Sequence, residues 1–260
     1  MPDQSVATAT KLSVNLNAVA FLRNRRDMPW PSVVEMARLV LDAGAHGITV
    51  HPRPEQRHIR FSDVHDLSAL IAAEYPGAEF NVEGYPTPEF LDLAMASKAH
   101  QVTLVPDEPG QSTSDHGWNV AQNLDLLQGA ISALRSHGQR VSLFVDVDAT
   151  SVHAAAEVGA DRVEFYTGPY AALFEGGQHK AELERLAEAA QAARHARHNT
   201  RPGTPGLTMN AGHDLTLANL PALKAVVPDL AEVSIGHGIT ADALIMGFPE
   251  AVRRYLQVLS

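Results

Sequence analysis

The residues of this chain best suited to do chemistry are two histidines and a glutamate, each of which follows a short apolar segment. His51 ends the run GITVH, Glu83 follows FNV, and His213 follows NAG. Imidazole and carboxylate groups transfer protons near neutral pH, and burial raises the pKa of a glutamate toward that range. Glu83 therefore suits a general base or proton shuttle near neutral pH. The plainer alternative for Glu83 is a structural ion pair with an arginine at the mouth of an apolar barrel.

A basic segment follows His51 and is typical of an anion site. It reads HPRPEQRH, contains Arg53, Arg57 and His58, and is stiffened by two prolines. Guanidinium presents a planar fork to phosphate, and imidazole adds a switchable donor. Neighbouring arginines oppose a metal cation and no second ligand cluster matches, so we expect no metal site. An exposed basic loop is the alternative.

Two glycine-containing segments predict a second anion site. Asn210-Ala211-Gly212-His213 and Gly236-His237-Gly238 each follow an apolar run, one repeat apart. Glycine lets backbone N–H groups approach phosphate oxygens, and a helix N-terminus beside them attracts negative charge.

Further polar residues end the other apolar runs. They are Asn15, Asn17, Asp107, Asp146, Asp148, Glu164, Tyr166 and Thr167. The opposite ends carry mostly glycine, alanine and charges that we expect to be solvated. Loops are polar in any protein, so a single one of these residues means little, whereas the whole series indicates one functional end.

The elements that must position these residues alternate in type along the chain. Strands are expected at Leu12–Leu16, Gly47–Val50, Glu79–Val82, Gln101–Val105, Arg140–Val145, Arg162–Phe165, Leu207–Met209 and Glu232–Ile235. Amphipathic helices are expected at Ser32–Asp42, Ser62–Glu74, Pro88–Ser97, Val120–Ser136 and Ala181–Arg197. Eight such repeats predict an α/β fold, a (β/α)₈ TIM barrel with extra helical segments. A doubly wound open sheet is the runner-up, but its glycine-rich turn after the first strand is missing.

Composition narrows the class of protein. The chain has 260 residues, a formal net charge of −10 and no cysteine. We expect a disordered tail over residues 1–10, one catalytic domain over 11–260, and no nucleic-acid or membrane partner. The absence of cysteine and of a signal peptide favours a cytoplasmic location. The four lysines are not placed for a Schiff base, and no Gly-x-Ser-x-Gly elbow appears.

Taken together, these segments resemble the pyridoxine 5′-phosphate synthase family. The stretches that carry the resemblance are VNLNAVAFLRN, DAGAHGITVHPRPEQRHI, EFNVEG, TLVPD with TSDHG, RVSLFVD, AAEVGADRVEFYTGPYA, LTMNAGHDLT and VSIGHGI. They run in order from Val14 to Ile239. The resemblance implies condensation of 1-deoxy-D-xylulose 5-phosphate with 3-amino-2-oxopropyl phosphate to give pyridoxine 5′-phosphate, phosphate and water. It also implies no cofactor and a homo-octamer.

The resemblance assigns roles to individual residues. His51 and Glu83 would be proton acceptors, His213 the proton donor, and Glu164 a transition-state stabiliser. The residues that would bind the two phosphorylated substrates are Asn15, Asn17, Arg26, Arg53, His58, Thr113, Asp214, Gly236 and His237.

Three positions depart from the family pattern. Many members have Asp-His where this chain has Asn17-Ala18, Gly where it has Asp214, and His where it has Tyr166. These departures leave open a different phosphosugar lyase or isomerase on the same barrel. A non-catalytic sensor of phosphorylated ligands also stays open, because a fold does not by itself imply a function.

Overall fold

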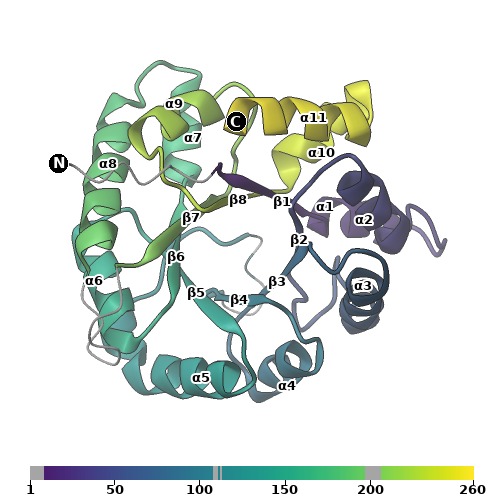
Figure 1. Cartoon of the computed structure of the whole chain (residues 1–260), viewed down its shortest axis with the longest axis horizontal. Helices are drawn as coiled ribbons and strands as arrows, with labels where there is room; N and C mark the ends of the chain where they lie inside the picture. The colour runs from purple at the N-terminus through teal and green to yellow at the C-terminus, as the bar shows by residue number, and fades with distance from the viewer. Residues whose placement is uncertain (1–8, 108–110, 112, 197–205) are drawn as a thin grey trace.

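The computed structural model describes residues 9–107, 111, 113–196 and 206–260. Eight parallel strands pair in chain order, and the last pairs with the first, so the sheet is a closed barrel. Figure 1 shows the strands as a ring inside the helices. The strands are β1 (Lys11–Asn15), β2 (Gly47–Val50), β3 (Glu79–Gly84), β4 (Gln101–Leu104), β5 (Arg140–Val145), β6 (Arg162–Tyr166), β7 (Thr208–Gly212) and β8 (Glu232–Ile235). The predicted (β/α)₈ barrel is confirmed.

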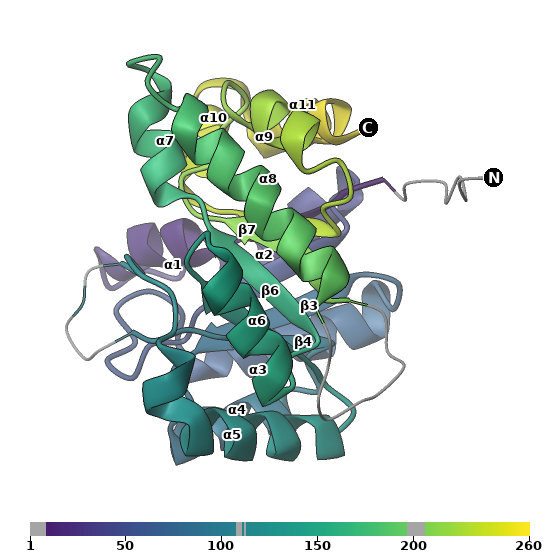
Figure 2. The same cartoon turned by 90° about the vertical axis from the view of Figure 1, so that its left-hand side faces the viewer.

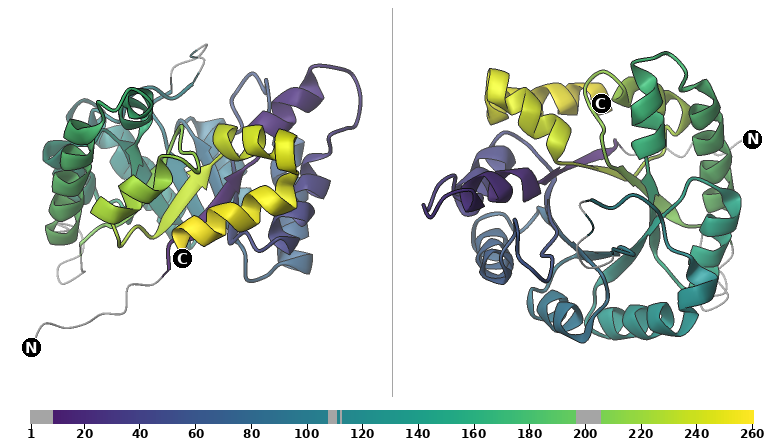
Figure 3. Two further views of the ribbon diagram at one scale, coloured as in Figure 1. Left: turned by 90° about the horizontal axis from the view of Figure 1, so that it is seen from above. Right: turned by 180° about the vertical axis from the view of Figure 1, so that it is seen from behind.

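Helices connect the strands and cover the outside of the barrel. They are α1 (Asn17–Asn24), α2 (Val33–Asp42), α3 (Phe61–Glu74), α4 (Pro88–Ala96), η1 (Val120–Asn123), α5 (Leu124–Ser136), α6 (Ala149–Val158), α7 (Gly168–Phe174), α8 (Lys180–His195), α9 (Leu220–Val226), α10 (His237–Met246) and α11 (Phe248–Leu259). Helices α6 and α8 lie side by side along β6 (Figure 2). Helices α10 and α11 pack together beside β1 (Figure 3).

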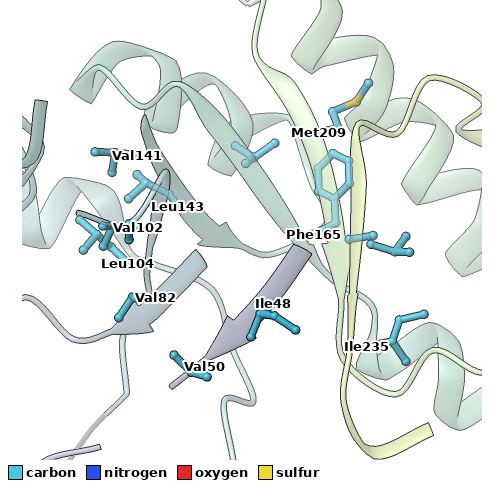
Figure 4. Close-up of a cluster of buried hydrophobic side chains, with 14 of the residues drawn as sticks. Ile48, Val50, Val82, Val102, Leu104, Val141, Leu143, Phe165, Met209 and Ile235 are labelled. Atoms are coloured by element: carbon cyan, nitrogen blue, oxygen red, sulfur yellow. The ribbon is translucent and has the colours of Figure 1, made fainter. Parts of the chain in front are cut away.

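Alternation along each strand separates an apolar outer layer from the barrel interior. Successive side chains of a strand point to opposite faces, so every second residue meets the helices. The outward residues are branched or aromatic, and those of Figure 4 include Ile48, Val82, Leu143, Phe165 and Ile235, all almost fully buried. Burial of this layer between strands and helices supplies most of the driving force for folding.

The residues that point into the barrel are polar, contrary to the expected apolar interior. The hydroxyls of Ser13 and Thr49 lie 2.7 Å apart, Asn81 Nδ2 donates to Thr49 at 3.4 Å, and Thr103 donates to Asn81 Oδ1 at 3.0 Å. Buried polar groups are stable only when hydrogen-bonded, and this ladder pairs them strand to strand. The interior of the barrel is therefore a hydrogen-bonded layer of polar side chains.

The amino-terminal ends of the strands also differ from expectation, because several of their charges are buried. Glu79 pairs with Arg140 and lies 3.6 Å from Arg162. Nδ2 of Asn210 donates to Oε1 of Glu232 at 3.2 Å, and Oδ1 of Asn210 accepts from Nη1 of Arg162 at 3.2 Å. The prediction of mostly glycine, alanine and solvated charges at this end was wrong.

The described residues between 11 and 260 form one closed barrel with its surrounding helices. Thr10 is also buried, and its hydroxyl donates to the carbonyl of Leu230 at 2.8 Å. Residues 1–8 of the expected tail and Arg197 of the expected last helix lie outside the described residues. No helix among the described residues is long and apolar enough to cross a membrane.

Candidate active site

A cavity of about 810 Å³ lies at the carboxyl ends of the strands, and it gathers residues from most of the chain. All the predicted site residues except Arg26 line it: Asn15, Asn17, His51, Arg53, His58, Glu83, Thr113, Glu164, His213, Asp214, Gly236 and His237. Loops after parallel strands meet at one end of a barrel, which explains why distant segments converge there. His51, Glu83 and His213 thus share one cavity.

Glu83 and Glu164 are two buried carboxyl groups on the inner wall. Burial raises the pKa of Glu83 well above its usual value, and the negative charges of Glu164, Asp107 and Glu232 add to the rise. Burial also raises the pKa of Glu164, to about 7. The raised pKa of each group brings its proton exchange closer to neutral pH, as acid–base catalysis by a glutamate requires. Oε2 of Glu164 has no hydrogen-bond partner among the described residues, which leaves it available to a ligand.

His51 is a buried neutral imidazole. Burial lowers its pKa well below the usual value, and Arg53, His58 and Arg57 lower it further. Its backbone N–H donates to Oδ1 of Asn17 at 2.9 Å. Asn17, one of the departures from the family pattern, therefore holds the backbone of His51 in place while its amide nitrogen remains for a ligand. A neutral imidazole can accept a proton, as the predicted role requires.

The segment after β2 forms the basic side of the cavity. Arg53 and His58 are both buried, and burial lowers the pKa of His58 to about 4. An ion pair not anticipated from the sequence supports this segment: Arg23 donates to both carboxylate oxygens of Asp63, at 2.6 and 2.9 Å, and to the His58 carbonyl at 3.1 Å. Bidentate pairing of this kind fixes geometry. The basic segment is therefore held in one conformation by these hydrogen bonds, unlike the exposed loop of the alternative interpretation.

His213 lies between two partners on opposite ring nitrogens. Nδ1 is 3.1 Å from Oδ2 of Asp214, and Nε2 is 2.8 Å from Oγ1 of Thr113. The carboxylate favours the tautomer with its proton on Nδ1. The ring of Tyr166 packs edge-on against the imidazole at 5.2 Å. All three neighbours restrict the ring, and two of them, Asp214 and Tyr166, are departures from the family pattern.

Backbone conformation explains how Asp214 can replace glycine. Its φ is 56° and that of His213 is 87°, both left-handed, a region that aspartate tolerates better than most residues. The hydrogen bond from His213 lowers the pKa of Asp214. Its carboxylate is thus engaged by the imidazole, which lessens the expected conflict between this anion and a phosphate.

The glycine-containing turn after β8 leads directly into a helix. Helix α10 begins at His237, and Gly236 precedes it against Asn15, whose side chain lies 3.2 Å from where a Cβ on Gly236 would sit. The first N–H groups of a helix have no partners within the helix, so they can meet an anion. This turn, together with His237, forms the side of the cavity next to His213.

Arg26 is the predicted site residue that the fold does not bring to the cavity. It is exposed in the turn after α1, and its backbone N–H donates to the carbonyl of Arg23. No group of metal-ligating side chains occurs among the described residues. Several cavity residues were missed from the sequence, among them Phe21, Phe144, Ser234 and Leu244. Ser234 and Phe144 sit at inward positions of their strands, so strand alternation could have identified them.

A closed parallel barrel with a cavity of ionisable side chains at its carboxyl mouth is typical of (β/α)₈-barrel enzymes. Solved barrels agree with the fold. An archaeal ribulose 1,5-bisphosphate carboxylase/oxygenase matches with a TM-score of 0.64 at 11% identity, covering 98% of this chain and 60% of that one. A phosphoribosyl anthranilate isomerase matches with a TM-score of 0.55 at 14% identity, covering 96% and 98%. At these identities the likeness concerns the fold alone.

Several known proteins have a much higher sequence identity to this chain than these solved structures do. The family described as pyridoxal phosphate biosynthesis protein PdxJ matches residues 12–260. A pyridoxine 5′-phosphate synthase of Brucella abortus (strain S19) is 56% identical over 252 residues, 96% of this chain and 98% of that protein. The enzyme of that name from Chelativorans sp. (strain BNC1) is 57% identical over 249 residues, 95% and 97%. The chain belongs to the PdxJ family.

Proposed function

We propose that this chain is a pyridoxine 5′-phosphate synthase that condenses 1-deoxy-D-xylulose 5-phosphate with 3-amino-2-oxopropyl phosphate. The observation that carries the proposal is the meeting of His51, Glu83 and His213 in one cavity between a basic segment and a helix N-terminus. Two anion-binding sides suit two phosphorylated substrates. The family and its relatives, which bear this enzyme's name, point the same way.

The protonation states of the site suit the steps of the condensation. The amine of the second substrate is cationic at neutral pH and must lose a proton before it can attack the ketone. Glu83, whose pKa burial raises well above the usual value, is a suitable acceptor. Neutral His51 accepts a second proton, and His213 supplies one to a departing oxygen. Glu164 faces developing positive charge. No covalent intermediate with the protein is needed, because positioned acids and bases suffice.

The phosphate groups are divided between the two sides. Arg53 and His58, with Thr113 at the rim, hold the deoxyxylulose phosphate. Asn15 and the N–H groups at Asp214, Gly236 and His237 hold the amino-ketone phosphate. Arg26 lies outside the cavity of the single chain, so its contact with substrate is the least supported of these assignments.

The direct test is formation of pyridoxine 5′-phosphate by purified protein with both substrates, followed by its absorbance. Omission of each substrate in turn is the control. Turnover of one phosphorylated ketone alone would favour a lyase or isomerase instead. Tight binding of both ligands with no turnover by a folded protein would favour a sensor.

The setting of the enzyme forms part of the same proposal. A cytoplasmic location and a homo-octamer follow from the family resemblance. Exposed apolar residues on α1 and α10, among them Phe21, Leu22, Leu244 and Ile245, offer contact area for assembly. Size-exclusion chromatography with light scattering measures the number of subunits, and a monomer at micromolar concentration would contradict the octamer.

A further inference from the structure

Asp107 is a buried carboxylate behind the substrate cavity. It lies three residues after β4, and its Oδ2 accepts hydrogen bonds from Nη2 of Arg53 and, at 2.9 Å, from Oγ of Ser114. The same oxygen lies 3.7 Å from Nε2 of His51, just beyond hydrogen-bond distance. One carboxylate oxygen therefore lies next to both Arg53, which is predicted to bind phosphate, and His51, which is predicted to accept a proton.

We propose that Asp107 is a positioning residue, which holds Arg53 toward the substrate phosphate and serves as the counter-ion of His51 when that imidazole takes up a proton. The inference rests on the proposed function and adds to it a residue that acts through its neighbours.

The placement of Asp107 points to an indirect role at the main cavity. His51 and Arg53 line that cavity, whereas Asp107 does not. Asp107 instead lines a second cavity of about 530 Å³, together with His51, Arg53, Tyr85 and Trp118. His51 and Arg53 line both cavities and so form part of the wall between them, whereas Asp107 lines the second cavity.

The fork of Arg53 shows what Asp107 contributes to anion binding. One terminal nitrogen is fixed by the carboxylate, while Nε is buried without a hydrogen-bond partner among the described residues. An unpaired buried donor is costly, and a phosphate oxygen would satisfy it. Fixing one arm of the guanidinium orients the remaining donors before the ligand arrives, which reduces the entropy lost on binding.

The charges around His51 show why a counter-ion is needed. Arg53, Arg57 and His58 come from the segment after β2, Glu83 from the end of β3, and Asp107 from the segment after β4. Arg53, His58 and Arg57 lower the pKa of His51 below its usual value, beyond the effect of burial. Asp107 is the carboxylate that faces Nε2. A proton on Nε2 would turn this close approach into a charge-assisted hydrogen bond.

The test compares Asp107→Asn with Asp115→Asn in the full-length protein. Asparagine keeps the size of Asp107 and removes its charge. Asp115 is an exposed carboxylate of the same segment, bonded to His116 and Gln111, and so supplies the matched control. Three quantities are measured: the NMR titration midpoint of the His51 imidazole, the dissociation constant of inorganic phosphate, and kcat and KM for the deoxyxylulose phosphate.

Asp107→Asn is expected to lower the His51 midpoint, weaken phosphate binding at least about tenfold, and reduce kcat as well as raise KM. Asp115→Asn should stay within about twofold of wild type. The proposal is overturned if folded Asp107→Asn leaves both the His51 midpoint and phosphate affinity unchanged. The NMR and phosphate readouts need no turnover, so they separate a failure of this inference from a failure of the proposed activity.

If Asp107→Asn does not fold, Ser114→Ala provides a second test of the role of Asp107. It keeps the carboxylate and removes one of its donors, which strengthens the negative charge facing His51. The His51 midpoint should then rise. A midpoint equal to that of wild type would overturn the proposal.

Discussion

Oγ1 of Thr113 lies 2.8 Å from Nε2 of His213, so the segment after β4 reaches across the barrel mouth to the loop after β7. With Nδ1 held by Asp214, both nitrogens of the predicted general acid have a partner before any substrate binds. A substrate oxygen that takes the place of Thr113 at Nε2 would lie in line for proton transfer from the doubly protonated His213, because Asp214 holds the proton of the neutral ring on Nδ1. The site is therefore largely preorganised, which lowers the entropic cost of reaching the transition state.

Replacement of His213 by alanine should remove the proton donor. We expect kcat to fall by about 10²-fold or more, the usual cost of a lost general acid, with little change in fold. His137→Ala, at an exposed position after α5, is the control. Steady-state kinetics with both substrates measure the effect, and a rate near that of wild type would show that the donor is another group.

The pH dependence should depend on the coupled carboxyl groups. Glu83 must be ionised to accept a proton, and burial, with the charge of Glu164 adding to it, raises its pKa, so kcat/KM should rise with pH through a value above the usual glutamate range. Glu164→Gln removes that repulsion and should move this acid limb to lower pH while also lowering kcat. Asp92→Asn, exposed on α4, should leave the limb in place. A limb that stays where it is in Glu164→Gln would mean that the two carboxyls do not interact.

Gly212 leaves room for the carboxylate of Glu164. A Cβ at position 212 would lie 2.4 Å from Oε1 of Glu164 and 3.3 Å from the Ser234 carbonyl oxygen, so Gly212→Ala must displace the glutamate. We expect kcat to fall by about tenfold or more, because displacement of a catalytic group by ~1 Å can lower the reaction rate ~10²-fold. Gly129→Ala on α5, where nothing lies within 4 Å of the added Cβ, is the matched control and should keep full activity. Equal rates for the two variants would contradict the role of Glu164.

Glu232 should make stability depend on pH. Burial raises its folded pKa to about 8, with Glu79 and Glu164 adding to the rise against Arg162 and Arg140. The folded protein therefore holds a proton that the unfolded chain loses near its usual value of 4.5. That contribution to stability is complete below pH 4.5 and is lost as the pH rises through 8.

Glu232→Gln does not titrate, so its Tm relative to wild type should increase from pH 5 to pH 9. The relative gain should reach about 2 kcal/mol or more, roughly 4–8 °C for a chain of this size. Thermal unfolding across this range measures it, with Glu89→Gln, an exposed carboxylate, as the control. A Tm difference that is constant or shrinks with pH would argue against a raised pKa.

Sequence periodicity predicted the strands and the residues at their carboxyl ends. Gly47–Val50, Arg140–Val145 and Glu232–Ile235 are confirmed with the same bounds, because short branched runs bordered by polar or small residues have few other structures available. The convergence of His51, Glu83 and His213 followed from the barrel itself, since every strand ends at the same mouth.

The barrel interior could have been predicted but was not. Ser13, Thr49, Asn81, Thr103 and Asn210 occupy inward positions of their strands, and the period of two was visible in the sequence. The expectation of an apolar interior came from barrels in general. The alternation of polar and apolar residues within each strand indicated a polar interior instead.

Pairings between distant charges were beyond reach of the sequence. Nothing local links Arg23 to Asp63 or Arg53 to Asp107, because each pair forms only when separate loops pack together. Arg26 shows the opposite limit, since a family role carried over by motif does not bring its side chain into the cavity of a single chain.

The most direct test of the account is a crystal structure of the protein grown or soaked with inorganic phosphate. Two anions should bind in the main cavity, one against Arg53 and His58 and one at the N–H groups of Gly236 and His237, with Glu83 between them. Anions that bind only outside this cavity would rule out the proposed arrangement of the site.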